Sequence, residues 1–331
     1  MKTQSHGPKR LNILWLPGYQ DSYKEPLGFL KKGEVVMKLF KKSLIMFLVL
    51  AMILPINVAK VKAEDVLLKT AKTSTWLWNT AEIVTDSDKI INFLVVNNVK
   101  ILYLQIDYTL KKEFYNSFIE KANEKNIAVQ ALDGSAGWVN ADGASHRIKF
   151  FDWLTKYQQS SLETQRFQGV HLDVEPYLNS KYAKNPNSVF EKYQEFLLMS
   201  KSSSTKLNLE FSIDIPFWFH EISYKNKYGK GNVAEWIFEN IKAVTIMAYR
   251  DTATGIINVS QSEMNLCEKY NVKATIAVGT GKSTEGNFVT FYEEGKTNMY
   301  NQLNTVSDKY IQNSAFDGVA IHYLNSWMAM N

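Results

Sequence analysis

From residue 75 onward, the chain alternates between two kinds of segment. Short apolar runs rich in β-branched residues are followed by longer stretches in which apolar residues recur with a helical period. Eight of the short runs are expected to be strands: 75–78, 101–107, 127–133, 170–175, 207–215, 243–249, 274–278 and 318–323. Seven of the longer stretches are expected to be helices: 87–97, 110–125, 145–159, 188–202, 233–239, 260–270 and 300–313.

This alternation is typical of parallel strands joined by crossover helices. Eight strands within about 260 residues match the usual size of a closed (β/α)₈ barrel. An open, doubly wound sheet is the alternative, but no glycine-rich phosphate turn follows the first expected strand. The sequence therefore predicts an α/β fold in which one (β/α)₈ TIM barrel occupies residues 64–331.

The first 63 residues differ from the rest in charge and hydropathy. They carry eleven Lys/Arg and three acidic residues, so the remainder has a net charge of −3 although the whole chain has +5. Three lysines precede an unbroken apolar run at 44–54, and Val61 and Ala63 place small residues at the −3 and −1 positions of a cleavage site. We therefore expect a secretory signal peptide at 37–63, cleavage after Ala63 and an extracellular barrel. A retained membrane anchor is the alternative.

Residues 1–36 fit neither the signal peptide nor the barrel. A signal peptide normally starts close to its basic region, and Met37 stands where a start codon would be. The preceding 32–36, Lys-Gly-Glu-Val-Val, resembles a translated purine-rich ribosome-binding site. We expect Met37 to be the true start and 1–36 to be a mis-annotated extension.

The charge distribution and the rare residue types limit the partners of the barrel. With its positive charge confined to the leader, the barrel is expected to bind no nucleic acid and, after signal cleavage, no membrane. The single Cys267 excludes an intramolecular disulfide and is expected to be buried and inert. Five histidines without paired spacing predict no metal site, and no cofactor is expected. We expect a monomer.

Ionisable and aromatic side chains accumulate where the expected strands end, which is where active sites of such barrels lie. The ionisable ones are Asp107, Asp133, Asp214 and Arg250, together with His171 of the fourth expected strand. The aromatic ones are Trp78, Trp138, Trp218 and Trp327. An acidic, aromatic-rich mouth suits a neutral polyol, because flat rings stack on sugar faces. We therefore expect these residues to bind substrate, although any one of them could instead be a helix cap or a core residue.

The fourth expected strand, 170–175, alternates valine or leucine with His171, Asp173 and Glu175. The three ionisable residues therefore share one face, toward the barrel interior, where unpaired charge is unfavourable. Cleavage of a glycosidic bond explains such a row, because the leaving oxygen must be protonated. Burial and the neighbouring Asp173 would raise the pKa of Glu175 and keep it protonated near neutral pH. Glu175 is therefore the expected general acid. A buried charge network is the structural alternative.

This strand resembles the DxxDxDxE signature of glycoside hydrolase family 18, the chitinase and endo-β-N-acetylglucosaminidase group. Gln168, His171, Asp173 and Glu175 occupy the four positions of the signature. Tyr249 matches the tyrosine of the family's Met-x-Tyr on the sixth strand. Because Gln168 and His171 replace two aspartates, the chain is expected to be a divergent member.

The resemblance implies substrate-assisted retention. Glu175 would protonate the leaving oxygen while the substrate's own N-acetyl carbonyl attacks the anomeric carbon. Asp173 would orient and stabilise the acetamido group, and Tyr249 would donate a hydrogen bond to it. Glu175 would then act as the base for water. In the family, the aspartate at the position of His171 is the partner of the aspartate at the position of Asp173.

These observations predict a secreted glycosidase of an N-acetylglucosamine-containing polysaccharide or oligosaccharide, such as chitin, peptidoglycan or a surface glycan. A two-carboxylate glycosidase of another family is an alternative, with Asp107, Asp214 or Glu285 as its second carboxylate. A non-catalytic carbohydrate-binding barrel and an enzyme that acts on a different substrate also fit the pattern, because a fold does not determine function.

Overall fold

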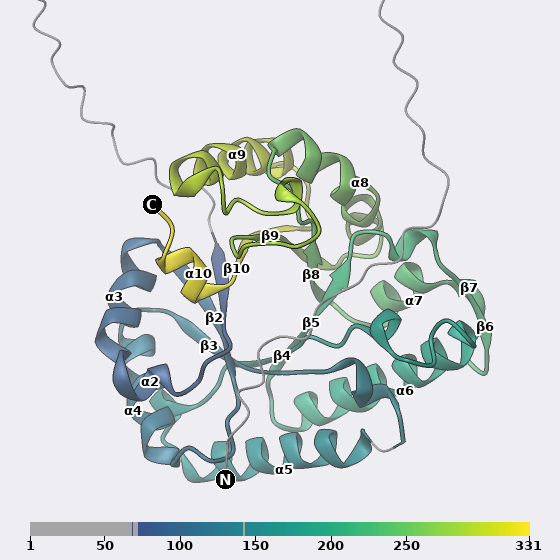
Figure 1. Cartoon of the computed structure of the whole chain (residues 1–331). Helices are drawn as coiled ribbons and strands as arrows, with labels where there is room; N and C mark the ends of the chain where they lie inside the picture. The colour runs from purple at the N-terminus through teal and green to yellow at the C-terminus, as the bar shows by residue number, and fades with distance from the viewer. Residues whose placement is uncertain (1–67, 69–71, 142) are drawn as a thin grey trace, which may run out of the picture. The chain divides into compact units, whose positions relative to one another are not determined.

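The eight expected strands close into a barrel in the computed structural model, which describes residues 68, 72–141 and 143–331. Their order around the barrel is β1-β10-β9-β8-β5-β4-β3-β2 (Figure 1). The strands are β1 (Thr73–Leu77), β2 (Val99–Gln105), β3 (Ala128–Asp133), β4 (Gly169–Leu172), β5 (Glu210–Pro216), β8 (Ala243–Met247), β9 (Lys273–Gly279) and β10 (Phe316–His322). All neighbouring pairs are parallel, so the predicted (β/α)₈ fold is confirmed. The expected N-terminal extension and signal peptide lie outside the described residues.

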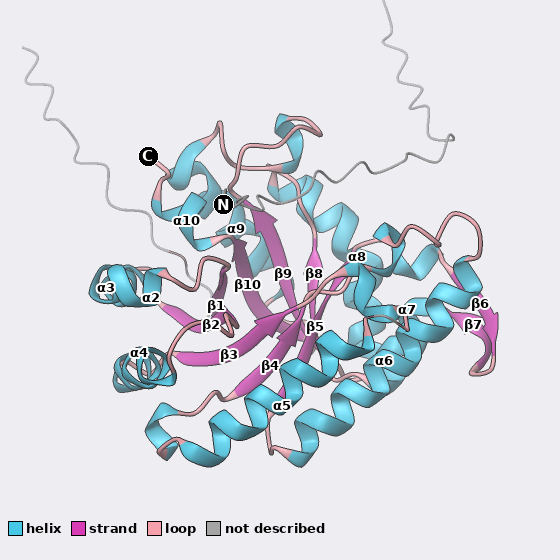
Figure 2. Ribbon diagram, turned by 60° about the horizontal axis from the view of Figure 1, so that its bottom comes forward, coloured by secondary structure: helices cyan, strands magenta, loops and turns pink. Residues whose placement is uncertain are grey.

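Helices surround the barrel, as Figure 2 shows from the side. They are α2 (Glu82–Thr85), α3 (Ser87–Val96), α4 (Lys112–Glu124), α5 (Ala144–Ser160), α6 (Pro186–Lys206), α7 (Val233–Asn240), α8 (Ala253–Lys269), α9 (Gly295–Tyr310) and α10 (Leu324–Met328). Each of the seven expected helices overlaps one of these. No helix of the described part is long and apolar enough to cross a membrane. Cys267 is buried in α8, as expected.

The strands contribute to two separate cores because alternate side chains point to opposite faces. The outward-facing residues, such as Leu77, Leu102 and Leu104, pack with the helices. The inward-facing set is smaller and more aromatic, with Trp76 and Tyr103 at its centre. Burying one large apolar side chain contributes about 1.5–3 kcal/mol, so the outer core accounts for most of the stability. The barrel interior is left for polar and aromatic groups.

The barrel closes between its first and last strands, where Thr73 pairs with Val319. Gly318 has φ +125°, and a Cβ atom there would lie 2.2 Å from the carbonyl oxygen of Lys72. Only glycine combines this backbone conformation with so close an approach. Closure of the barrel therefore requires glycine at position 318, and the chemistry of the site does not determine this residue.

Two features differ from the expected elements. Strand β4 ends at Leu172, so Asp173 and Glu175 follow the strand instead of belonging to it. An antiparallel hairpin of β6 (Ser223–Asn226) and β7 (Gly229–Asn232) lies between β5 and α7 and was not predicted. Its residues are mostly polar and exposed, so they lack the apolar alternation that marks a strand in sequence.

Candidate active site

The fourth strand places its polar residues as the alternation predicted. Val170, Leu172 and Val174 are buried in the outer core. His171 points the other way and stacks on Tyr103 of the inner core, with 3.7 Å between ring centroids. The alternation continues past the end of β4, so the side chains of the next polar residues rise from the barrel interior toward its mouth.

His171 is fully buried beneath the mouth. Its Nδ1 lies 2.8 Å from Ser212 Oγ, and its Nε2 lies 3.0 Å from Asp214 Oδ2. Burial lowers the pKa of His171 to about 3, so the ring is neutral near pH 7. With no exposed surface, His171 lies under the site and does not contact substrate. This corrects the expectation that it binds substrate.

Two aspartates lie beside His171. Asp214 of β5 is 3% exposed and accepts a hydrogen bond from Trp76 Nε1 at 3.3 Å. Burial raises the pKa of both Asp173 and Asp214 well above the usual range, and the charge of Asp214 raises that of Asp173 further. Atom Oδ1 of each residue is buried without a hydrogen-bond partner among the described residues. Each carboxyl group therefore keeps a buried oxygen whose polarity is not compensated by a hydrogen bond within the described residues.

Glu175 follows on the same face. Burial raises its pKa to about 7, while a hydrogen bond from the Tyr177 hydroxyl to Oε2 opposes the shift. The charges of Asp214 and Glu285 add to the increase. A carboxyl group with this pKa exchanges its proton readily at neutral pH, as a general acid/base must.

Tyr249 follows β8 and faces the same cluster. Burial raises the pKa of its hydroxyl, and the charges of Asp214, Asp173 and Glu175 raise it further. The phenol therefore stays protonated and can donate a hydrogen bond into the site. The structure thus brings together the residues expected to be catalytic, although their roles stay predictions.

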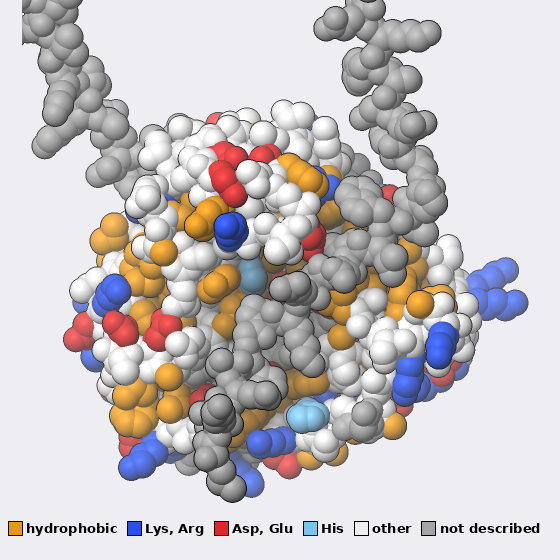
Figure 3. Space-filling view, in the orientation of Figure 1, with side chains coloured by type: hydrophobic (Ala, Val, Ile, Leu, Met, Phe, Trp, Pro, Cys, Tyr) orange, Lys and Arg blue, Asp and Glu red, His pale blue; other side chains and the backbone are white. Residues whose placement is uncertain are grey.

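Partly buried aromatic side chains border the mouth. Trp78 donates from Nε1 to His322 Nε2 at 3.1 Å, and the His322 ring lies 5.9 Å from that of Tyr249. Trp218 contacts Tyr177, with 4.9 Å between ring centroids. Hydrophobic side chains are spread widely over this face, and basic ones lie mainly toward its edge (Figure 3). Trp78 and Trp218 therefore stay candidates for stacking on a sugar ring.

The other two tryptophans are core residues, which corrects the expectation that they bind substrate. Trp138 is 5% exposed and packs edge-on against Phe150 and Phe196. Trp327 is fully buried, and its Nε1 donates to the Tyr300 hydroxyl at 3.1 Å. Neither ring has a free face for a ligand. A tryptophan just beyond a strand end can turn toward the helices as easily as toward the mouth, and sequence does not distinguish the two.

Three further expected site residues lie around the rim and not in the cluster. Asp107 Oδ1 accepts from Thr109 N at 2.8 Å, so its carboxylate stabilises a turn, and its expected contact with substrate stays a prediction. Asp133 accepts from the Tyr108 hydroxyl at 3.0 Å. Arg250 lies over the Phe217 ring, 5.0 Å from its centroid. Asp133 and Arg250 stay candidates for contacts with a longer ligand.

Several residues of the site were not predicted. Trp76, Tyr103 and Ser212 occupy inward positions of β1, β2 and β5, and the period of two along each strand was the available signal. Tyr177 comes from the 3₁₀ helix Pro176–Leu178, which bends the chain back toward Glu175. No periodicity predicts such a bend.

The loop after β3 holds Asp173 in place from the side. Asp173 N donates to Asp133 O at 3.1 Å. A Cβ atom on Gly134 would lie 1.9 Å from the carbonyl oxygen of Asp173, so only glycine fits there. The backbone that carries Asp173 is therefore fixed by its neighbouring strand.

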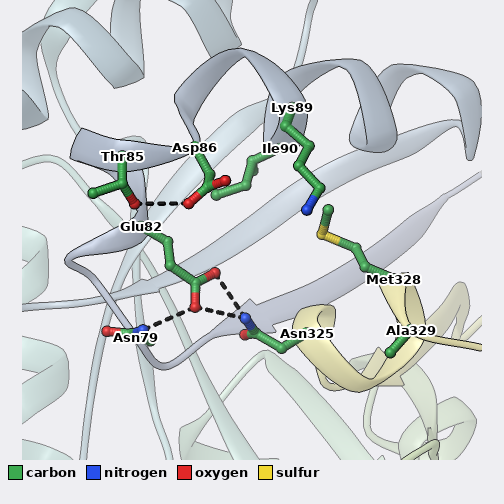
Figure 4. A pocket seen from close by; sticks show the side chains of 9 residues that line it. All are labelled: Asn79, Glu82, Thr85, Asp86, Lys89, Ile90, Asn325, Met328 and Ala329. Atoms are coloured by element: carbon green, nitrogen blue, oxygen red, sulfur yellow. Dashed lines mark hydrogen bonds between the residues drawn. The ribbon is translucent and has the colours of Figure 1, made fainter.

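A separate pocket of about 520 Å³ lies at the ends of β1 and β10 (Figure 4). Glu82 on its wall accepts hydrogen bonds from Asn79 at 2.8 Å and from Asn325 at 2.7 Å. None of the clustered carboxyl groups lines this pocket. Within the described residues, no group of three or more His, Cys, Asp or Glu side chains is arranged to hold a metal ion.

Sequence comparison finds no matching family model and no matching curated protein. Among solved structures, the chain is similar to the spore cortex-lytic enzyme SleL of Bacillus megaterium QM B1551, with 13% identity, a TM-score of 0.45 and coverage of 78% of this chain and 72% of that one. The GH18 chitinase of Cycas revoluta in complex with (GlcNAc)₃ has 12% identity, a TM-score of 0.42 and coverage of 77% and 96%.

Tryptophan synthase from M. tuberculosis reaches the same level, with 10% identity, a TM-score of 0.42 and coverage of 78% and 84%. Structural similarity at this level therefore does not indicate which reaction the protein catalyses. The solved structures to which this chain is similar include a member of the family that β4 and Glu175 resemble.

Proposed function

We propose that the chain is a glycoside hydrolase with Glu175 as its general acid and base. The observation that carries this proposal is the cluster of Asp173, Glu175 and Asp214, in which the pKa of Glu175 is raised to about 7. Within the described residues, no lysine or arginine forms an ion pair with any of the three. A cluster built for stability would contain compensating cations, whereas a proton-transfer site needs the raised pKa.

Glu175, Asp173 and Tyr249 have different roles in the proposed reaction. Glu175 gives its proton to the glycosidic oxygen, and the substrate's acetamido carbonyl attacks the anomeric carbon. Asp173 would accept the acetamido N–H, and Tyr249 would donate to the carbonyl oxygen. Glu175, now a carboxylate, takes a proton from the water that opens the oxazolinium ion, and this returns the site to its starting state.

The proposed substrate is an N-acetylglucosamine-containing polysaccharide, because Asp173, Glu175 and Tyr249 match the positions that act on an acetamido group in family 18. Trp78 and Trp218 would stack on its sugar rings. We further propose that the protein acts outside the cell as a monomer after cleavage behind Ala63, a proposal supported by the apolar run at 44–54 and the basic residues before it.

The test compares the wild-type chain with Glu175→Gln on chitin oligomers and on peptidoglycan, with products identified by mass spectrometry. New reducing ends are expected from the wild type only. Glu82→Gln is the matched control, because Glu82 is a carboxylate of the separate pocket and lies outside the cluster, and it should cleave like the wild type. Equal cleavage by Glu175→Gln would mean that the acid is misassigned. Saccharide binding without cleavage by the wild type would favour a binding module.

A further inference from the structure

Two aromatic side chains flank Arg250 at the mouth of the barrel. Strand β8 lies between β5 and β9, and Arg250 follows β8 in the sequence. Phe217 comes directly after β5, and Phe288 belongs to the 3₁₀ helix Asn287–Val289 after β9. The guanidinium carbon of Arg250 lies 5.0 Å from the centroid of the Phe217 ring and 5.7 Å from that of Phe288. Both rings are therefore close enough to attract the cation through their π faces.

Hydrogen bonds hold the charged end and the backbone of this arginine. Arg250 Nη1 donates to the carbonyl oxygen of Tyr249 at 2.7 Å. Asp251 N donates to Phe288 O at 3.2 Å, so the chain beside Arg250 is bonded to the segment that carries one of the two rings. The residue is half-buried. A side chain that is held in place before binding loses less conformational entropy when a ligand binds.

Most hydrogen-bond donors of Arg250 have no acceptor within the described residues. A guanidinium group has five N–H donors, and the bond to Tyr249 uses one of them. Burial lowers the pKa of Arg250, and the charges of Asp251 and Glu285 raise it. Neither carboxylate forms an ion pair with Arg250, and no other acidic side chain of the described part does so. The planar fork of the guanidinium is therefore available to a ligand.

Arg250 belongs to the same mouth as the proposed general acid. It directly follows Tyr249, which faces the carboxyl cluster. Burial raises the pKa of Glu285, and the charge of Arg250 lowers it. The pKa of Glu175 is raised by burial and also by the charge of Glu285. A sugar whose acetamido group lies at Tyr249 would therefore place its own substituents, or those of the next sugar, near Arg250.

We propose that Arg250 binds a carboxylate carried by the glycan, on a sugar or on a peptide attached to it. The preferred substrate is then an anionic N-acetylglucosamine-containing chain such as peptidoglycan, and not neutral chitin. This inference rests on the proposed function. The carboxyl cluster at the centre of the mouth suits an uncharged ring, whereas Arg250 at the rim suits an anionic substituent.

The chemistry of a guanidinium explains this preference. Its planar fork forms two parallel N–H···O bonds with a carboxylate, and a neutral hydroxyl or amide cannot replace this pair of bonds. A singly charged carboxylate also suits the place better than a doubly charged phosphate, because the negative charges of Asp251 and Glu285 act on the same group. Arg250 would thus determine specificity without taking part in proton transfer.

Binding tests this role without relying on cleavage. Two kinds of peptidoglycan strand serve as ligands in calorimetry with Glu175→Gln, which should leave them uncut. Strands stripped of peptide have free carboxylates on the sugar, whereas in strands that keep their peptides the sugar carboxyl is blocked and the peptide provides the carboxylates. Each is compared with a copy whose carboxyl groups have been converted to amides. The carboxylate form should bind about 10- to 100-fold more tightly than its amide form, and adding Arg250→Gln should remove the difference.

The two kinds of strand distinguish the sources of the carboxylate. A preference in the stripped strands places the carboxylate on the sugar, and a preference in the peptide-bearing strands alone places it on the peptide. Equal binding of carboxylate and amide forms in both kinds of strand would overturn the proposal. This comparison changes only the ligand, so it holds even if Arg250→Gln does not fold.

Two further variants separate the fork of Arg250 from its charge. Arg250→Lys keeps the charge but loses the planar fork, so its preference for the carboxylate form should be intermediate. Arg166→Gln is the matched control, because Arg166 is an exposed arginine that precedes β4, at the end of the barrel opposite the mouth. It should keep the full preference, and circular dichroism should show each variant folded. Loss of the preference in Arg166→Gln would indicate a general effect of charge and refute the role of Arg250.

Cleavage kinetics distinguish failure of this proposal from failure of the proposed function. In an active enzyme, Arg250→Gln should raise KM about 10- to 100-fold for the carboxylate strands and much less for chitin oligomers, with a smaller effect on kcat. An active wild type in which the two rises in KM are equal would retain the function and refute the carboxylate site. A wild type that cleaves none of the glycans, yet shows an Arg250-dependent preference in binding, would refute the function and retain the site.

Discussion

At the scale of single residues, the chemistry of Glu175 is set by two opposing effects. Burial raises its pKa to about 7, and the hydrogen bond donated by Tyr177 lowers it. The same bond orients the carboxyl group, because Tyr177 is itself held against Trp218. The usable pH range of a general acid depends on this balance, because the acid must be protonated before it can act.

Removing the Tyr177 hydroxyl should therefore change the pH range. In Tyr177→Phe, the pKa of Glu175 is expected to rise, so the basic limb of the kcat/KM profile should move to higher pH. Loss of orientation should lower the maximum about 10-fold. The control is Tyr182→Phe, on the same segment, where the ring packs on Phe190. A basic limb that stays in place or moves to lower pH would show that the Tyr177 bond does not control Glu175.

At the scale of elements, the site depends on contacts between a strand and the loop after its neighbour. The loop after β3 packs closely against the backbone of Asp173, and Gly134 makes the contact. A displacement of about 1 Å in a catalytic group can cost about 100-fold in rate. The identity of residue 134 is therefore determined by the position of Asp173 and not by the preferences of the loop.

Gly134→Ala is accordingly expected to lower kcat about 100-fold and to destabilise the fold by about 1–3 kcal/mol, as measured by denaturant unfolding. Gly137→Ala is the matched control on the same loop, since its nearest contact would be an ordinary 3.8 Å to Ser135 Oγ. Similar activity of the two variants would mean that the loop accommodates the added methyl group without displacing Asp173.

The final helix, α10, places a large aromatic side chain in the core. Trp327 of α10 is buried against Phe93 and Tyr300, so it ties the end of the chain to α3 and α9. Trp327→Ala should lower the free energy of unfolding by about 3–5 kcal/mol because it leaves a large cavity. Trp78→Ala, at the partly exposed mouth, should instead weaken saccharide binding with a smaller loss of stability. The reverse pattern in urea unfolding and binding assays would contradict these placements.

At the scale of the whole molecule, buried groups that the reaction does not use still affect stability. Glu263 of α8 is fully buried and contacts His220 Nδ1 at 2.7 Å. Burial raises its pKa from 4.5 to about 7. A carboxyl group whose pKa is raised on folding contributes stability below pH 4.5, and that contribution is lost as pH rises through about 7.

Glu263 alone should therefore remove about 3 kcal/mol of stability between pH 5 and pH 8. His171 and His322 act in the opposite direction, because their lowered pKa values, about 3 and about 4, cost stability as pH falls below about 6.5. In denaturant unfolding, the difference in stability between Glu263→Gln and the wild type should therefore shift in favour of the variant by about 3 kcal/mol from pH 5 to pH 8. A difference that stays constant over this range would exclude a titration of Glu263.

The parts of the fold and of the site that could be predicted are those with a periodic pattern of apolar and polar residues. The eight strands and the inward face of His171, Asp173 and Glu175 follow from the alternation of apolar and polar residues, which is a local property of the chain. The hairpin β6–β7 and the bend that brings Tyr177 to Glu175 were not predicted, because neither has an apolar period. Trp138 and Trp327 were placed wrongly because the residue types near a strand end do not show whether a side chain points toward the mouth or toward the helices.

Local hydropathy and the geometry of an extended chain are enough to define the barrel and the row of polar residues on its fourth strand. They do not define which groups from other strands meet that row, and this depends on the folded barrel. The pairing of β4 with β5 brings Ser212 and Asp214 to His171, while β1 and β2 bring Trp76 to Asp214 and Tyr103 to His171. Such contacts depend on strand order and stagger, which no single segment of the sequence encodes.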